Sequence, residues 1–302
     1  MRLLVVEGNR KETWQKREAL GGVPYHKRFQ AMLRILQPKA EVAIAFPADD
    51  DTLLPSVNQL RSFQGVLWTG SSLHVNDPSP AIWRQLAFAE DVFKSGVPFY
   101  GSCWGLQVAT KVAGGQVASC LKGREFGITK PIELMDSGKQ HVYFKGRTEK
   151  YSALCLHLDE IVKLPENSEV LARNDHSEVQ ALTIRYKNSE FFGVQYHPEF
   201  LVSDLVFIAR QMSQSLFNEG IFETEEGIAN FISDLEDPSN FPSEISNYSL
   251  HIQEVKSWLD CAVRPTITKD YQRNQNFMLN GQFSKRNGKN VKNDVSNIKP
   301  SP

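Results

Sequence analysis

The sequence predicts an α/β fold: a doubly wound, mostly parallel sheet followed by a C-terminal helical extension. Short apolar runs alternate with segments of helical spacing through the first two thirds of the chain, which is typical of such a sheet. With 302 residues the chain can bury a large core. From about Leu201 helical runs follow one another. We therefore divide the chain into a domain at 1–217, a helical extension at 218–265 and a flexible polar tail at 266–302.

The first elements follow from apolar spacing, taken in chain order. Period-two and short buried runs indicate strands, and apolar residues three and four apart indicate helices. The pattern predicts a strand at Arg2 to Glu7, a helix at Tyr25 to Leu36, strands at Val42 to Phe46 and Gly65 to Trp68, and a helix at Pro80 to Lys94.

The later elements alternate less regularly. Further strands are expected, some of them antiparallel, at Ile128 to Leu134, Val179 to Tyr186 and Phe191 to Gln195. Helices are expected at Leu201 to Phe217, where one would close the domain, and at Glu223 to Leu235 and Leu250 to Leu259.

Composition excludes several classes of site and partner. A net charge of -1 gives no field that would attract nucleic acid, and the basic residues of the tail are too few and too scattered to favour a nucleic-acid-binding arm. No apolar run is long enough for a membrane span or a signal peptide, so a cytoplasmic protein is expected. The four cysteines are dispersed, which indicates neither a disulfide framework nor a zinc site. No phosphate-binding or dinucleotide motif is present, and neither a cofactor nor a metal is predicted.

The stretch VPFYGSCWGLQ places a cysteine between a strand and a helix. Val97 to Tyr100 predicts a short buried strand, and the apolar spacing after Cys103 predicts a helix that ends near Gly114. Gly101 and Gly105 would allow a tight turn with close backbone approach, as in a nucleophile elbow. A thiol at a helix N-terminus is favoured as the thiolate. Taken alone, the pattern fits a buried core cysteine equally well.

A second stretch, VQYHPEF, supplies a base for such a nucleophile. A strand ends in His197-Pro198-Glu199, and in extended chain residues two apart point the same way. Glu199 can then orient the imidazole of His197, as the third member of a triad does. A third stretch, TGSS, follows the strand at Gly65 to Trp68. We expect oxyanion donors from the backbone N–H of Gly70 or Ser71 and from that of Trp104.

These stretches, in this order, resemble the class I, or triad, glutamine amidotransferase family. The resemblance lies in GSCWGLQ, VQYHPE and TGSS, covers roughly residues 1–210, and is greatest to stand-alone domains similar to the amidotransferase domain of GMP synthetase. Three further pieces fit this family: Arg124 to Gly127, His157 to Glu160 and Glu178 to Ala181. It implies a flavodoxin-like fold and a Cys103, His197, Glu199 triad that cleaves the side-chain amide of glutamine through a glutamyl thioester.

The resemblance also implies that Gln107 lines the substrate pocket. His74 follows the TGSS loop closely and is a second candidate to touch substrate. We expect His157 and Asp159 in a strand-end loop at the rim of the site. The other histidines, His26, His141, His176 and His251, lack metal-ligand spacing and are expected on the surface or in loops.

The sequence departs from the family in two respects. Thr-Gly-Ser-Ser replaces the Gly-Gly-Pro-Gly run of many relatives, which affects the geometry of the oxyanion loop. No ATP-pyrophosphatase loop follows, so the chain is not a complete GMP synthetase.

Three functions remain open at this point. The first is a glutaminase that supplies ammonia to a synthetase partner, and the second a free-standing hydrolase of γ-glutamyl amides or peptides. The third is a non-catalytic binding or redox-sensing protein, against which the paired His197 and Glu199 argue. The C-terminal helices could cover a sheet edge, form a homodimer contact or dock a partner.

Overall fold

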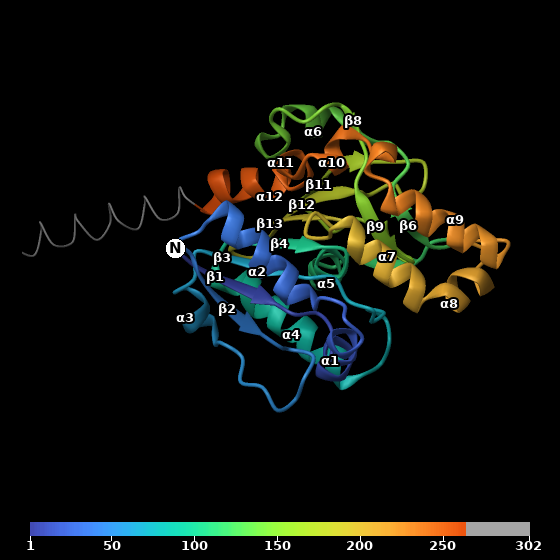
Figure 1. Cartoon of the computed structure of the whole chain (residues 1–302). Helices are drawn as coiled ribbons and strands as arrows, with labels where there is room; N and C mark the ends of the chain where they lie inside the picture. Colours follow the sequence, from blue (N-terminus) through green and yellow to red (C-terminus); the bar gives the residue numbers. More distant parts are fainter. Residues whose placement is uncertain (264–302) are drawn as a thin grey trace, which may run out of the picture.

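A nine-stranded sheet forms the centre of the molecule in the computed structural model, which describes residues 1–263 (Figure 1). The predicted tail at 266–302 lies outside the described residues. In spatial order the strands are β2 (Glu41–Ala45), β1 (Arg2–Val6), β3 (Gly65–Trp68), β4 (Phe99–Ser102), β13 (Ser189–Val194), β12 (Ala181–Tyr186), β11 (Ser168–Arg173), β7 (Ile132–Leu134) and β8 (Lys150–Tyr151). Pairing is parallel from β2 to β13 and antiparallel from β13 to β8.

Two short ribbons stand beside the main sheet. They pair β5 (Gln116–Ser119) with β10 (Asp159–Lys163), and β6 (Glu125–Ile128) with β9 (Leu154–His157). The longer helices are α1 (Lys11–Ala19), α2 (Tyr25–Leu36), α4 (Pro80–Ser95), α5 (Trp104–Val112), α7 (Val202–Gln211) and α9 (Glu225–Glu236). The shorter ones are α3 (Val57–Leu60), α6 (Asp136–Gln140), α8 (Ser213–Asn218), α10 (Ser243–Ser246), α11 (Tyr248–His251) and α12 (Gln253–Trp258). Short 3-10 turns are η1 (Val142–Phe144) and η2 (Pro238–Asn240), and a π-helical turn is η3 (Leu259–Val263).

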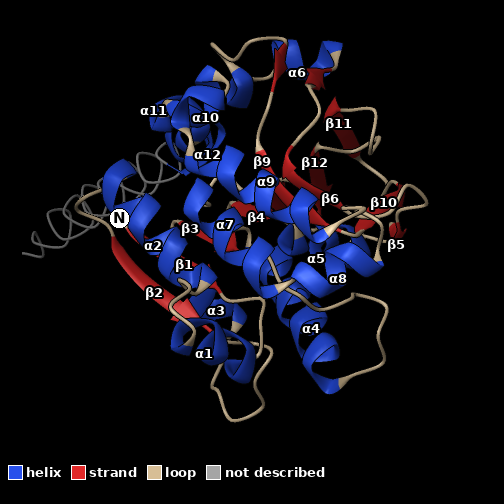
Figure 2. Cartoon of the chain, turned by 45° about the vertical axis from the view of Figure 1, so that its right-hand side comes forward, coloured by secondary structure: helices blue, strands red, loops and turns tan. Residues whose placement is uncertain are grey.

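Helices cover both faces of the sheet, as a doubly wound fold requires (Figure 2). One core cluster joins β1 and β4 to α2 on one face, with Phe29, Met32 and Tyr100 fully buried. The other joins the opposite face to α4 and α5. A third, smaller cluster contains side chains of α7, α9 and α10.

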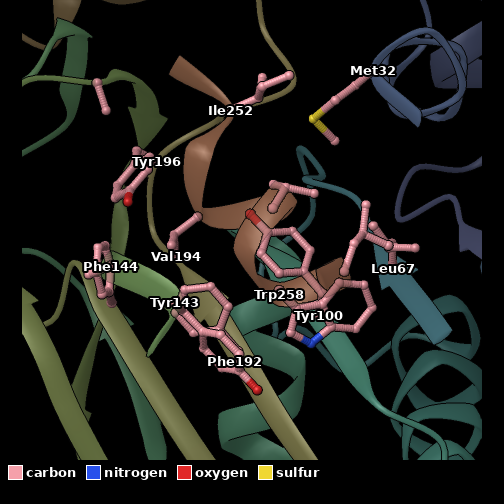
Figure 3. Packing of buried hydrophobic residues seen from close by; sticks show 14 of the residues in the cluster. Met32, Leu67, Tyr100, Tyr143, Phe144, Phe192, Val194, Tyr196, Ile252 and Trp258 are labelled. Atoms are coloured by element: carbon pink, nitrogen blue, oxygen red, sulfur yellow. The ribbon is translucent and has the colours of Figure 1, made fainter. Parts of the chain in front are cut away.

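The last two C-terminal elements, α12 and η3, are part of the first core and not an appendage to it. Ile252, Val255, Trp258 and Leu259 are buried in the same cluster as side chains of β1 and α2. Figure 3 shows Trp258 beside Tyr100 of β4, and their ring centroids are 5.6 Å apart. No helix in the described part of the chain has both the length and the apolar character needed to cross a bilayer.

The predicted α/β fold with C-terminal helices is confirmed, and α2 and β3 have the predicted bounds. The strand expected at Ile128 to Leu134 is wrong as one element: it divides into β6 and β7 around Pro131, which cannot donate to a ladder. The helix expected at Leu201 to Phe217 divides at Met212 into α7 and α8.

Candidate active site

Cys103 lies on the turn between β4 and α5, as the sequence predicts. Its backbone has φ 48° and ψ -100°, an unusual conformation for a residue with a side chain. A Cβ on Gly101 would lie 2.6 Å from the carbonyl carbon of Gly105, and one on Gly105 would lie 2.7 Å from the carbonyl oxygen of Trp68. Both glycines are therefore needed for the close packing that holds this turn.

His197 and Glu199 follow β13, the strand that pairs with β4, so they reach the same end of the sheet as Cys103. Nδ1 of His197 donates to Oε1 of Glu199 over 2.7 Å, and the hydroxyl of Ser102 donates to the same oxygen over 3.1 Å. The imidazole also stacks on Phe200, with ring centroids 3.9 Å apart and planes at 7°. The hydrogen bond at Nδ1 and the stacking on Phe200 together fix the orientation of the His197 ring.

The sulfur and the imidazole converge on one atom. Sγ of Cys103 lies 3.6 Å from the carbonyl oxygen of Leu156 in β9, and Nε2 of His197 lies 3.4 Å from it. Burial disfavours the charged imidazolium, but the Glu199 carboxylate and hydrogen bonding to Cys103 outweigh it and raise the pKa of His197 to about 10. The site therefore favours a protonated His197 beside the carboxylate of Glu199.

The residues predicted to form an oxyanion hole lie beside His197 and Cys103: Gly70 packs against the imidazole, and Trp104 follows Cys103 in the chain. A Cβ on Gly70 would lie 2.6 Å from Cε1 of His197, and one on Gly8 would lie 2.6 Å from Cδ1 of Trp104. The side chain of Ser71 donates to the carbonyl of Gly8 over 3.0 Å, which fixes the loop after β3. Trp104 is the first residue of α5, where a backbone N–H has no acceptor within the helix.

A cavity of about 490 Å³ opens in front of Cys103. Its inner walls include Cys103, His197, Gln107 and Asp159. Its outer wall is formed by α1 and α7 and by the residues that follow them, and carries the apolar side chains of Trp14, Leu20, Phe207, Ile208 and Met212. Cationic side chains on the wall are Lys16, Arg17 and Arg124.

Gln107 and His74, the two candidate substrate-binding residues, both line the cavity. Nε2 of Gln107 donates to the backbone oxygen of Asp159 over 3.1 Å. Nδ1 of the half-exposed His74 lies 3.0 Å from Oδ2 of Asp159, and Ser119 donates to Oδ1. Asp159 therefore connects both candidate substrate-binding residues, which its sequence position alone did not indicate.

The buried carboxylate of Glu125 connects the three further stretches that fit the family. Glu125 accepts from Nε2 of His157 over 2.9 Å, from Nδ2 of Asn174 over 2.7 Å and from Nε2 of Gln180 over 2.8 Å. Burial opposes its charge, but the hydrogen bonds from His157 and Asn174 lower the pKa of Glu125. His157 is fully buried in the wall, and so is not a rim residue.

Sequence reasoning missed a second buried pair beside the site. Nδ1 and the backbone N–H of His26 lie 2.7 Å and 2.9 Å from Oε2 of Glu7, and Asn9 donates twice to Oε1. The expectation that His26 and His251 lie on the surface is wrong, since both are buried. Helix α1 was also missed, because it has no buried face and so no apolar stripe.

Comparisons with known proteins agree on one family. The profile described as "Glutamine amidotransferase class-I" matches residues 49–205. A "Gamma-glutamyl-L-1-hydroxyisopropylamide hydrolase" of Pseudomonas sp is 31% identical over 288 residues, covering 90% of this chain and 96% of that protein. The glutamine-hydrolysing GMP synthase subunit of Sulfolobus acidocaldarius is 32% identical over 145 residues, covering 48% of this chain and 71% of that protein. A solved glutamine amidotransferase from Thermotoga maritima matches with a TM-score of 0.61 and 15% identity, covering 85% and 98% of the two chains.

Proposed function

Because this chain belongs to the class I glutamine amidotransferase family, we propose that it is a free-standing hydrolase of γ-glutamyl amides. The observation that carries this proposal is the cavity in front of Cys103. Its volume of about 490 Å³ is in the range of drug-sized ligand sites and exceeds what a single amino acid requires. Its apolar outer wall suits an amide substituent larger than NH2.

The likeness to a γ-glutamyl amide hydrolase supports the same substrate class. That alignment covers 90% of this chain, so it must extend past residue 217 into the helical extension. The alignment with the GMP synthase protein covers about half of the chain. The alignment with the hydrolase therefore spans more of this chain than the alignment with the GMP synthase protein does.

In this proposal the glutamyl group lies at the polar inner end of the cavity. Gln107, Asp159 and Arg124 offer an amide, a carboxylate and a guanidinium to its charged α-substituents. Arg124 is held in place by two hydrogen bonds to Glu219, of 2.6 Å and 2.9 Å. The amide substituent would then point toward Trp14, Phe207 and Met212.

The proposed reaction has two halves. The Cys103 thiolate attacks the amide carbon, and backbone N–H groups of Trp104 and the Gly70 loop stabilise the negative oxygen. Protonated His197 donates to the leaving nitrogen, so that the C–N bond breaks and a free amine departs. Neutral His197 then takes a proton from water, whose oxygen attacks the thioester carbon. The C–S bond breaks, which restores the thiolate–imidazolium pair and releases glutamate, whose new γ-carboxyl group gives its proton to the solvent.

A second candidate is a glutaminase that delivers ammonia to a synthetase on another chain. The likeness to GMP synthase proteins of Sulfolobus acidocaldarius and Methanosphaera stadtmanae supports it. It predicts that L-glutamine is the preferred substrate and that turnover rises when a partner binds.

The test is amine release from L-glutamine and from γ-glutamyl amides that carry ethyl, isopropyl and hydroxyisopropyl groups, with the isolated protein. We expect brisk turnover of the substituted amides, abolished by Cys103→Ala and His197→Ala. A preference for L-glutamine with weak turnover alone would favour the second candidate. No turnover of any substrate, together with no labelling of Cys103 by a diazoketone analogue of glutamine, would contradict both.

A further inference from the structure

The C-terminal extension holds both sides of the segment that carries the proposed base. Tyr196 immediately precedes His197, and its hydroxyl donates to Oε1 of Glu254 in α12 over 2.6 Å. Phe200 follows Glu199, and its backbone oxygen lies 3.0 Å from Nε2 of His251 in α11. A carbonyl oxygen only accepts, so His251 is the donor. Residues more than fifty positions downstream thus contact the segment at two points.

The first contact belongs to a fully buried network. Glu254 has no exposed surface, and Arg147, itself almost fully buried, donates to its Oε1 over 2.6 Å. The hydroxyl of Tyr196 also lies 3.0 Å from that of Tyr151, and the guanidinium of Arg147 lies 4.3 Å above the Tyr151 ring. Figure 3 shows Tyr196 in the same packed cluster as Ile252 and Trp258 of the extension. A buried charge pair of this kind fixes one geometry, since breaking it leaves an uncompensated charge.

The second contact acts on the face of the imidazole. The Phe200 ring is stacked on His197, so the position of Phe200 sets the plane of that ring. His251 is buried, and burial lowers its pKa to about 4, although its hydrogen bond to Phe200 opposes the shift. His251 is therefore neutral at physiological pH, and its Nε2–H group donates to Phe200 without titrating there.

We propose that His251 and Glu254 are positioning residues of the hydrolytic site, which they serve by fixing Phe200 and Tyr196 on either side of His197 and Glu199. The inference rests on the proposed function. Reaction rate depends steeply on the orientation of a general acid, and a displacement of the order of 1 Å costs about a hundredfold. The extension accordingly completes the site in this chain, and the core domain is not sufficient without it.

The test compares substitutions that release one contact with one that only loosens the extension. Tyr196→Phe removes the hydroxyl that reaches Glu254, and His251→Leu removes the donor to Phe200. His251→Gln keeps an N–H donor on a side chain of similar reach and serves as the rescue variant. Val255→Ala is the matched control, because Val255 is fully buried in α12 and its apolar side chain can make no hydrogen bond to this segment.

Two readouts separate positioning from folding. The first is kcat and KM for the best γ-glutamyl amide, beside the thermal midpoint of unfolding. We expect Tyr196→Phe and His251→Leu to lower kcat by about tenfold with KM changed less than about twofold. His251→Gln should recover most of the rate, and Val255→Ala should lose thermal stability while keeping kcat.

The second readout does not require hydrolysis. Alkylation of Cys103 by iodoacetamide, followed by peptide mass spectrometry from about pH 5 to 10, reports how well His197 supports the thiolate, and the exposed Cys261 is an internal reference. We expect the pH midpoint of Cys103 alkylation to rise in Tyr196→Phe and in His251→Leu, and to stay unchanged in Val255→Ala. If the wild type hydrolyses no amide, the proposed function fails, yet this profile still tests the positioning. Unchanged midpoints, or kcat losses in all four variants that merely follow their thermal midpoints, would overturn the inference.

Discussion

Gly70 and His197 are in van der Waals contact across the candidate site: a methyl group on Gly70 would lie only 2.6 Å from Cε1 of the imidazole and 3.6 Å from Tyr25. The loop that is proposed to bind the oxyanion and the proposed general acid therefore pack directly against each other. Any side chain at position 70 must displace one of them.

We expect Gly70→Ala to lower kcat by about tenfold or more, because the added methyl group moves the imidazole away from Cys103. The thermal midpoint should change less than the rate, because His197 borders the cavity and the displaced imidazole can move toward it. Gly227→Ala is the matched control: its nearest neighbour would be Thr224 at 3.4 Å, an ordinary contact, and it lies within α9. That control should gain about 0.5–1 kcal/mol of stability and keep full activity. Equal activity of both variants would show that Gly70 does not constrain His197.

The apolar outer wall should select for the amide substituent. Phe207→Ala removes a large ring from this wall, and we expect KM for the isopropyl amide to rise about fivefold or more, with KM for L-glutamine nearly unchanged. Phe217→Ala, a half-exposed phenylalanine that is not among the residues lining the cavity, should change neither constant. An equal rise in KM for both substrates would mean that the amide substituent does not bind against Phe207.

Glu125 should be a major determinant of stability. Glu125→Ala leaves donors of His157, Asn174 and Gln180 without their acceptor, and the free energy of unfolding should fall by about 3–5 kcal/mol in urea titrations. Glu178→Ala, which removes an exposed ion pair close by, should cost less than about 1 kcal/mol. Because the pKa of Glu125 is lowered on folding, its contribution should be present above about pH 4.5, its ordinary value, and be lost in more acidic solution. Similar losses for the two variants would contradict this role.

His197 should make stability depend on alkaline pH. Its pKa is raised from 6.5 to about 10, so between these values the native state binds more protons than the unfolded state. The resulting stabilisation is complete below about pH 6.5 and declines as the pH approaches 10. The difference in unfolding free energy between the wild type and His197→Asn should therefore narrow from pH 6.5 to 10. A constant difference over that range would mean that His197 is neutral in the native protein.

Most of the sheet was predictable, because local apolar spacing is strong where strands and helices are buried. The bounds of β3 and α2 follow from such spacing, and helix α4 agrees with its prediction to within one residue. Helix α1 could not be found this way, since none of its residues is buried, yet it forms one wall of the cavity. Strands β8 and β11 of the main sheet and the ribbon strands β5, β6, β9 and β10 were missed or merged, because short strands have little periodicity.

The sequence by itself determined the groups that make up the candidate site: a cysteine on a glycine-flanked turn, a histidine two residues before a glutamate, and a glycine loop after an early strand. Each signal lies within a few residues, where backbone geometry fixes side-chain direction. Only the tertiary structure decided what surrounds them. Glu125 with its three donors, Asp159 with His74, and His251 and Glu254 behind His197 are joined across 32 to 85 positions of sequence. Such contacts depend on how helices and strands pack, and local spacing carries no information about that packing.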